Sequence, residues 1–211
     1  MIHPGTRLKE VSDSIGVGVF ARTRIPKGTL VYVHDVLEIE LSPLRFSSLD
    51  EPLRSMAEKF SFIDAHGYRI LSWDTAKYVN HSCDPNTISA GYGFEIAIRD
   101  IEEGEEITDE YGLFNLQHDV KCLCGSQNCR RVIRASDIDE YYEQWDSWVQ
   151  DALQYLRGVD QPLIGLMDPD RRRALDTYLD TGRGYRSVRA LKHVGRVESL
   201  SIVDVNGEHI A

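Results

Sequence analysis

The run Asn80-His81-Ser82-Cys83-Asp84-Pro85-Asn86 constrains this chain more than any other stretch of its sequence. Proline removes a backbone donor and Asp and Asn favour turns, so the end of the run cannot continue a helix or a central strand. The run is therefore predicted to be a constrained polar loop that follows the short segment 76–79. Because this loop carries Asn, His and Cys close together, it is a candidate functional loop.

Two later segments are suited to meet this loop. One is the strand-like run Glu106–Tyr111, which ends in a tyrosine, and the other is 122–129, where three cysteines form the pattern C-x-C-x4-C. Four cysteines in a chain without a secretory signal favour a metal or free thiols over disulfides, and four thiolates make a closed tetrahedral zinc site. The sequence predicts one structural Zn²⁺, with four buried free thiols as the alternative. The predicted ligands are Cys83, Cys122, Cys124 and Cys129.

Length and composition limit the class of protein. The 211 residues suit one domain or two small ones, and 42% hydrophobic residues suit an ordinary globular core. No apolar run fits a signal peptide or a membrane span, so we expect a soluble intracellular protein, cytoplasmic if bacterial and with a nuclear location open if eukaryotic. The net charge of −10 makes the chain a poor ligand for nucleic acid and a better partner for basic peptides.

The charge is unevenly distributed. Seven of the eleven residues from Asp100 to Glu110 are acidic, which predicts either a solvated hairpin tip or a field that attracts a basic peptide towards Tyr111. Between Arg171 and Arg196, eight Arg or Lys stand against two Asp. This basic segment is a solvated face, a surface that docks on the acidic part of the chain, or a site for an acidic partner.

Periodicity gives a coarse order of elements. Strands are expected at 29–33, 36–41 and 94–98, with a hairpin over 62–73 and a helix over 49–60. After Cys129 the hydrophobic period becomes helical, and Ser136 is a candidate N-cap. We assign the aromatic stripe of this helix to the core. The helix is expected to end near Gly158 and Pro162. Asp168-Pro169 predicts the start of another helix. A third helix is expected at 188–194 and a short strand at 200–205.

Taken with the run Gly16–Ala21, these motifs resemble those of the SET-domain protein-lysine methyltransferases that carry a post-SET zinc segment. The resemblance covers roughly residues 5–134, and the cysteine cluster of a pre-SET region is absent. It implies a mainly β fold, the SET-domain β-clip of small sheets with a pseudoknot. The implied division is a SET domain over 1–117, a post-SET zinc segment over 118–134 and an α-helical C-terminal extension over 135–211.

The same resemblance implies S-adenosylmethionine-dependent methyl transfer to the ε-amine of lysine in a basic protein or peptide, which a histone or histone-like tail would fit. Tyr111 is the implied catalytic residue, whose hydroxyl orients the amine and helps its proton to leave. Each of these assignments has a structural alternative. Tyr111 could be a tyrosine packed in the core, the run Gly16–Ala21 a hairpin without a ligand, and Asn80-His81 a pair that only braces the loop. The implied cofactor-binding residues are Gly16, Val17, Gly18, Lys77, Asn80, His81 and Tyr111.

Three positions depart from the family pattern. Trp73-Asp74 stands where Gly-Asn is common, Lys77 where Arg is usual, and Asp109 where an aromatic residue commonly lines the lysine channel. These departures leave open a catalytically weak SET module that binds a peptide or partner. A zinc-ribbon nucleic-acid binder is a third hypothesis, for which only three arginines near the cysteines supply a basic face. They are Arg130, Arg131 and Arg134. The oligomeric state is not predicted.

Overall fold

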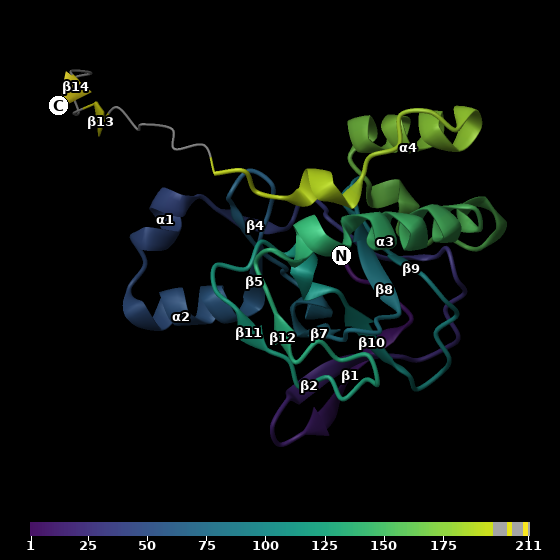
Figure 1. The fold of residues 1–211 in the computed structure, drawn as a ribbon, viewed down its shortest axis with the longest axis horizontal. Coiled ribbons are helices and arrows are strands. Elements are labelled where there is room, and N and C mark those ends of the chain that lie inside the picture. The colour runs from purple at the N-terminus through teal and green to yellow at the C-terminus, as the bar shows by residue number, and fades with distance from the viewer. Residues whose placement is uncertain (196–201, 204–208, 211) are drawn as a thin grey trace.

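The computed structural model describes residues 1–195, 202–203 and 209–210. Small sheets form the body of this part of the chain, and helices lie on two sides of them (Figure 1). Four strands pair in the order β1 (Thr6–Ser12), β2 (Gly16–Ala21), β10 (Glu106–Asp109) and β7 (Asn80–His81). Two three-stranded sheets have the orders β3 (Leu30–Val33), β9 (Phe94–Ala97), β8 (Thr87–Ala90) and β4 (Ile39–Leu41), β6 (Arg69–Leu71), β5 (Ser61–Ile63).

The remaining elements are short hairpins and helices. The hairpins pair β11 (Val120–Lys121) with β12 (Val132–Ile133) and β13 (Ile202–Val203) with β14 (His209–Ile210). The α-helices are α1 (Pro43–Ser47), α2 (Glu51–Phe60), α3 (Asp137–Leu153) and α4 (Pro169–Thr181). The 3₁₀ turns are η1 (Thr75–Tyr78), η2 (Tyr111–Leu113), η3 (Leu156–Gly158), η4 (Ile164–Leu166) and η5 (Val188–Leu191). No helix among the described residues is long and apolar enough to cross a membrane.

The predicted strands at 29–33 and 94–98 and the hairpin over 62–73 are confirmed as β3, β9 and the β5–β6 pair. The strand expected at 36–41 begins only at Ile39, and Pro43 opens helix α1 because its fixed φ suits the first helical turn. The helix expected at 188–194 is wrong in type and length, since only the 3₁₀ turn η5 forms there. Most of the strand expected at 200–205 lies outside the described residues.

Helix α3 ends at Leu153, before Gly158, and its chain continues through the tighter turn η3. Ser136 occupies the N-cap position as predicted, although its side chain accepts no capping hydrogen bond. Asp168 caps α4 through hydrogen bonds from the backbone N–H groups of Asp170 and Arg171, as the Asp-Pro pair predicts.

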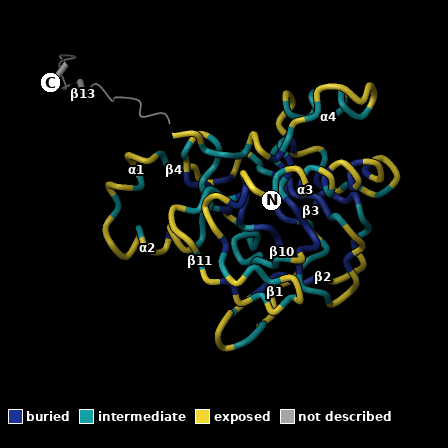
Figure 2. Tube along the Cα trace, viewed as in Figure 1, coloured by how far each residue is buried: buried dark blue, intermediate teal, exposed yellow. Residues whose placement is uncertain are grey.

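The C-terminal helices and the sheet of β3, β8 and β9 share one hydrophobic core. Leu30 and Ile96 from the sheet pack in the same cluster as Trp145 and Val149 from α3 and Leu175 from α4. All five side chains are buried, and the buried segments run between α3 and the strands beneath it (Figure 2). The aromatic stripe is therefore core, as predicted, and the C-terminal region packs directly on the strands of the predicted SET domain.

Strand β10 brings the central loop to the tyrosine. It pairs antiparallel with β2 and parallel with β7, where Thr108 lies beside Asn80 and Asp109 beside His81. The Asn86 side chain supports the same strand, because its amide donates to the Glu106 carbonyl and its oxygen accepts from the Thr108 N–H. The meeting of the loop with 106–111 is thus confirmed, while the threading of a pseudoknot stays a prediction.

Candidate active site and metal centre

Tyr111 is held at the first turn after β10. Its hydroxyl donates to the Val79 carbonyl at 2.6 Å, and its backbone N–H donates to His81 Nδ1 at 3.2 Å. The Glu110 side chain caps the turn by accepting from the Gly112 N–H at 2.8 Å. Burial, with the nearby carboxyls of Asp109 and Glu95, raises the pKa of Tyr111, so its phenol stays protonated near neutral pH.

The Tyr111 ring lines a cavity of about 520 Å³, which we call the first cavity. This volume is within the range of small-molecule sites in proteins. Its walls come from the end of α2, from β5 and β6, from η1 and from the segment 111–120. Phe60, Phe62 and Phe114 give it apolar walls, and Lys77 adds a cation.

The other predicted cofactor residues lie outside the lining of the first cavity. Asn80 Nδ2 donates to Glu106 Oε1 at 2.8 Å and to the Val17 carbonyl at 3.2 Å. A Cβ at Gly18 would come within 2.4 Å of Glu106 Oε1 and 2.9 Å of Asn80 Nδ2. Gly18 therefore makes room for this hydrogen bond, whereas Gly16, with φ +86°, serves the β1–β2 turn.

His81 connects the tyrosine to the cysteines. Its Nδ1 lies 3.2 Å from the Tyr111 nitrogen and 3.1 Å from the Asp109 carbonyl oxygen, and its Nε2 lies 3.3 Å from Cys83 Sγ. Burial, with the nearby Arg130 cation, lowers the pKa of His81 to about 4, so its ring is neutral. A neutral ring has one N–H, which donates from Nδ1 to the Asp109 carbonyl in one tautomer and from Nε2 to the Cys83 sulfur in the other.

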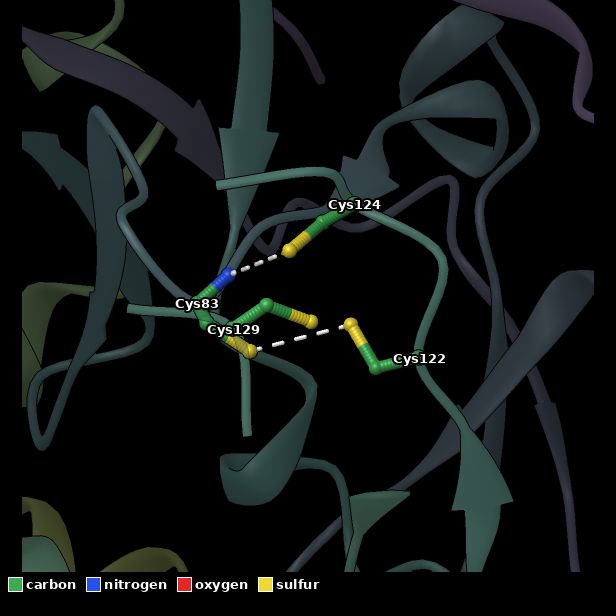
Figure 3. A group of neighbouring side chains, drawn as sticks. All are labelled: Cys83, Cys122, Cys124 and Cys129. Carbon is green, nitrogen blue, oxygen red and sulfur yellow. Dashed lines mark hydrogen bonds between the residues drawn. The ribbon is translucent and has the colours of Figure 1, made fainter. Parts of the chain in front are cut away.

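The four cysteines converge as predicted (Figure 3). Their Sγ atoms all lie within 4.8 Å of one another, and none is in a disulfide. The Cys83 and Cys122 sulfurs are 3.7 Å apart. Metal–sulfur bonds of about 2.3 Å give tetrahedral edges of about 3.8 Å. The four sulfurs can thus hold a tetrahedral metal ion.

Backbone donors around the cluster favour thiolates. The Arg130 N–H donates to Cys83 Sγ, and the Arg131 N–H donates to Cys129 Sγ, each at 3.4 Å. Gly125 between two of the ligands has φ +72°, which a glycine adopts without strain. The chemistry of the donor set, four sulfurs with N–H groups directed at them, fits a structural zinc ion.

Arg130 forms a buried network that sequence reasoning missed. Its guanidinium pairs with Glu110 at 2.5 Å and with Asp137 at 3.5 Å, and both carboxylates are almost fully buried. It also lies over the rings of Tyr141 and Trp145 at the start of α3. This one side chain therefore joins the cysteine segment, the turn that carries Tyr111, and the C-terminal helix. The only sequence signal is an arginine directly after the last cysteine.

Replacing Arg130 by glutamine is expected to lower the free energy of unfolding by about 3 kcal/mol, because Glu110 and Asp137 are left buried without a cation. Denaturant unfolding of the variant and the wild type measures this difference. Arg131→Gln changes an exposed neighbour and is the matched control. Equal stability of the Arg130 and Arg131 variants would show that the network contributes little.

Asp109 does not line a channel as the family pattern suggests. Its side chain is fully buried, and it hydrogen bonds to the Glu110 N–H at 2.7 Å and to the side chain of Glu95. Burial raises the pKa of Asp109 to about 6, and burial together with Asp109 raises the pKa of Glu95 well above its usual range. The two carboxyls thus share a proton, and Glu95 is the one that faces the first cavity.

This carboxyl pair predicts a pH dependence of stability. Because the folded pKa values lie above the unfolded ones, the folded state binds more protons, and the stabilisation is lost as pH rises through about 6. Because the raised pKa of Glu95 makes its ionisation in the folded state unfavourable, we expect Glu95→Gln to reduce the loss of unfolding free energy between about pH 5 and about pH 8. Denaturant titrations at the two pH values measure it. Glu58→Gln, on the same cavity but half exposed, is the control and should leave the slope unchanged.

The acidic segment around β10 contributes nothing to the cavity walls. None of its acidic side chains lines the first cavity. Asp100 pairs with Arg24, and Glu105 pairs with Arg99 at 2.6 Å. The hairpin tip at 102–104 is exposed as the solvated alternative predicts, whereas Asp109 and Glu110 are buried, and the Asp109 carboxyl is near enough to raise the pKa of Tyr111.

Small, mostly antiparallel sheets around a polar loop, a half-buried tyrosine beside a cavity and a four-cysteine centre are the features that the SET-like motifs of the sequence predict. Residues 16–112 match the family model described as "SET domain", so this part of the chain is similar to that family. The match covers β2 to the turn after β10 and includes both Asn80 and Tyr111.

Several relatives of this chain are named histone-lysine N-methyltransferases. The chain is 30% identical over 132 residues to "Histone-lysine N-methyltransferase trr" of Drosophila melanogaster, which covers 55% of this chain and 5% of that protein. It is 36% identical over 133 residues to "Histone-lysine N-methyltransferase ASHR3" of Arabidopsis thaliana, with 56% and 26% covered. The chain thus spans a small part of the length of these relatives.

One solved structure, "crystal structure of KRYPTONITE in complex with mCHG DNA and SAH", is similar over 58% of this chain and 27% of that chain. The TM-score is 0.40 and the sequence identity is 22%.

Proposed function

We propose that this chain transfers a methyl group from S-adenosylmethionine to the ε-amine of a lysine in a protein substrate. The observation that supports this most is the half-buried, protonated Tyr111, which donates to the Val79 carbonyl in the wall of the first cavity. It stands at the end of the matched SET domain, and relatives with this domain are named histone-lysine N-methyltransferases. Histones are therefore the first substrates to test.

We assign the donor to the first cavity and to the loop beside it. Lys77 and Tyr111 would contact it from the cavity wall, and Asn80 and His81 from the parallel pair of β7 and β10. Gly16, Val17 and Gly18 would approach it with backbone atoms of the neighbouring strand β2. S-adenosylmethionine supplies a methyl carbon that its positive sulfur already activates, so no covalent enzyme intermediate is required.

The protein would position the amine and keep it unprotonated. Tyr111 uses its proton in the hydrogen bond to Val79, so its oxygen is free to accept from the incoming amine. The apolar walls from Phe60, Phe62 and Phe114 exclude water, which lowers the pKa of a lysine that enters. Alignment of the amine with the methyl carbon in a dry cavity is then the main source of rate enhancement.

We also propose that the four-cysteine centre binds one structural zinc ion. Zinc held there would anchor the segment 120–133 over the loop that follows β7. The ion pair between Arg130 and Glu110 would then connect the zinc-bound segment to the turn that carries Tyr111. The domain limits proposed for this arrangement are 1–117, 118–134 and 135–211.

The test is transfer of labelled methyl from S-adenosylmethionine to core histones and to proteins of a cell extract. We expect labelled protein, with the label found on lysine by mass spectrometry of the digest. Donor binding by calorimetry without transfer to any protein would contradict the proposal. That result would favour the alternative, a SET module that binds partners without catalysis.

A further inference from the structure

A second cavity of about 290 Å³ adjoins the first. Six side chains line both cavities and form the wall between them, which we call the neck; they are Tyr32, Phe62, Ile63, Ile70, Glu95 and Phe114. Glu95 is the one carboxyl among these six. A side chain that enters the second cavity therefore reaches Glu95 at the same wall that borders the cavity of Tyr111.

Part of the lining of the second cavity comes from the C-terminal region. Arg171 from α4 and Arg186 from the segment after α4 line it, and neither lines the first cavity. Among residues 1–195, neither guanidinium forms an ion pair with a carboxylate. Arg171 Nη1 lies 3.4 Å from His34 Nδ1, and Arg186 lies over the Tyr92 ring at 5.8 Å.

The turn between β8 and β9 seats both arginines. A Cβ at Gly93 would lie 2.1 Å from Arg171 Nη1, and a Cβ at Gly91 would lie 2.5 Å from the Arg186 carbonyl oxygen. Glycine at both positions thus lets α4 and the following segment approach the turn closely. The close approach places Arg171 and Arg186 in the lining of the cavity.

Few negative groups compensate these cations. His34 is neutral, because burial and the Arg171 cation lower its pKa. Asp64 also lines the cavity, but its Oδ1 accepts from the backbone N–H groups of His66 and Tyr68, so that it caps its own turn. The second cavity therefore borders the Glu95–Asp109 pair at the neck, whose two carboxyls with one shared proton keep one negative charge, and it is also lined by two guanidinium groups without a carboxylate partner.

We propose that the second cavity binds the protein substrate, and that Arg171 and Arg186 select a target lysine flanked by an aspartate or glutamate. This inference rests on the proposed methyl transfer. The lysine ammonium would approach Glu95 at the neck, and the neighbouring carboxylate would pair with the two guanidinium groups. Arginine is suited to this role because its planar fork binds a carboxylate with two parallel hydrogen bonds. The C-terminal region would then set substrate choice rather than bind nucleic acid.

Binding of short fluorescent peptides tests the selection without methyl transfer. The probes are Ala-Asp-Lys-Asp-Ala, Ala-Arg-Lys-Arg-Ala, and the acidic peptide with norleucine in place of lysine, measured by fluorescence polarisation at low salt. We expect the wild type to bind the acidic lysine peptide about tenfold more tightly than either of the others, the ratio that about 1.4 kcal/mol gives.

The double variant R171Q/R186Q should lose the preference for the acidic flank. The matched control is Arg173→Gln, which removes an exposed arginine of the same helix that pairs with Asp170 and does not line the cavity. Melting temperatures of the three proteins establish that each is folded. A preference that persists in the double variant, equal binding of the three peptides, or tighter binding of the basic peptide would each overturn the inference.

Labelled methyl transfer to the same peptides separates this inference from the proposed function. Selective binding of the acidic peptide together with transfer to it supports both. Selective binding without transfer to any peptide or protein supports the selection and refutes the enzyme. Transfer to the basic peptide in preference to the acidic one supports the enzyme and refutes the selection.

Discussion

Replacing Tyr111 by phenylalanine is expected to lower kcat for methyl transfer by about 10²- to 10⁴-fold, the usual contribution of a positioned acid–base group. The ring that lines the first cavity is kept, but the oxygen that would hold the incoming amine is lost. Steady-state transfer of labelled methyl to core histones measures the change. Donor affinity should change little, because the cavity keeps its shape.

Stability has to be measured beside activity in this variant. The lost hydrogen bond to the Val79 carbonyl should cost about 1 kcal/mol, which leaves the protein folded. Tyr155→Phe removes the hydroxyl of a half-exposed tyrosine outside both cavities and is the matched control. Transfer that survives Tyr111→Phe at more than a tenth of the wild-type rate would remove Tyr111 from its catalytic role.

Replacing Cys122 by serine is expected to abolish zinc binding and to destabilise the segment 120–133. Cys122 is the most buried of the four cysteines, and a hydroxyl is a poor zinc ligand near neutral pH. Structural zinc contributes about 10–16 kcal/mol of apparent binding energy in small zinc domains, so its loss exceeds what the short β11–β12 hairpin supplies by itself. Elemental analysis and the melting temperature measure the two effects.

The wild type purified without chelator should contain one zinc ion per chain. His118 lies close in sequence but outside the four-sulfur cluster, so His118→Ala should keep its zinc and serves as the control. A wild type that contains no zinc would favour four free thiols. Zinc retained by Cys122→Ser at full stoichiometry would mean that the ligands are other residues.

Local patterns of the sequence were sufficient to predict the parts of the site that depend on short motifs. The Asp-Pro-Asn turn and the cysteine spacing predict a polar loop and a four-sulfur cluster. The cluster is present, and the loop covers 82–86, because Asn80 and His81 form the short strand β7 instead. Tyr111 follows a strand that pairs with the loop, as expected. In each case the constraint comes from a few neighbouring residues whose backbone preferences or ligand chemistry leave little choice.

The rest depends on contacts between distant segments. The Arg130 network joins residues of three elements, and the carboxyl pair of Asp109 and Glu95 joins two strands, so no local pattern marks either. The aromatic stripe of α3 predicts a buried face but cannot show that it covers β3 and β9. Helix α1 was missed because Pro43 both ends a strand and starts a helix, and the sequence does not decide between these roles.

The shared core of α3, α4 and the β3–β9–β8 sheet has a consequence for protein engineering. A chimera that joins residues 16–134 to a foreign tail would leave the outer faces of Leu30 and Ile96 without their partners Trp145 and Val149. The transferable unit therefore extends at least to Val188, the last buried residue of this core, and is longer than the family match. Because each of the two packed surfaces would be exposed apolar surface without the other, substitutions in the core residues of the helices and of the strands are expected to be correlated in evolution.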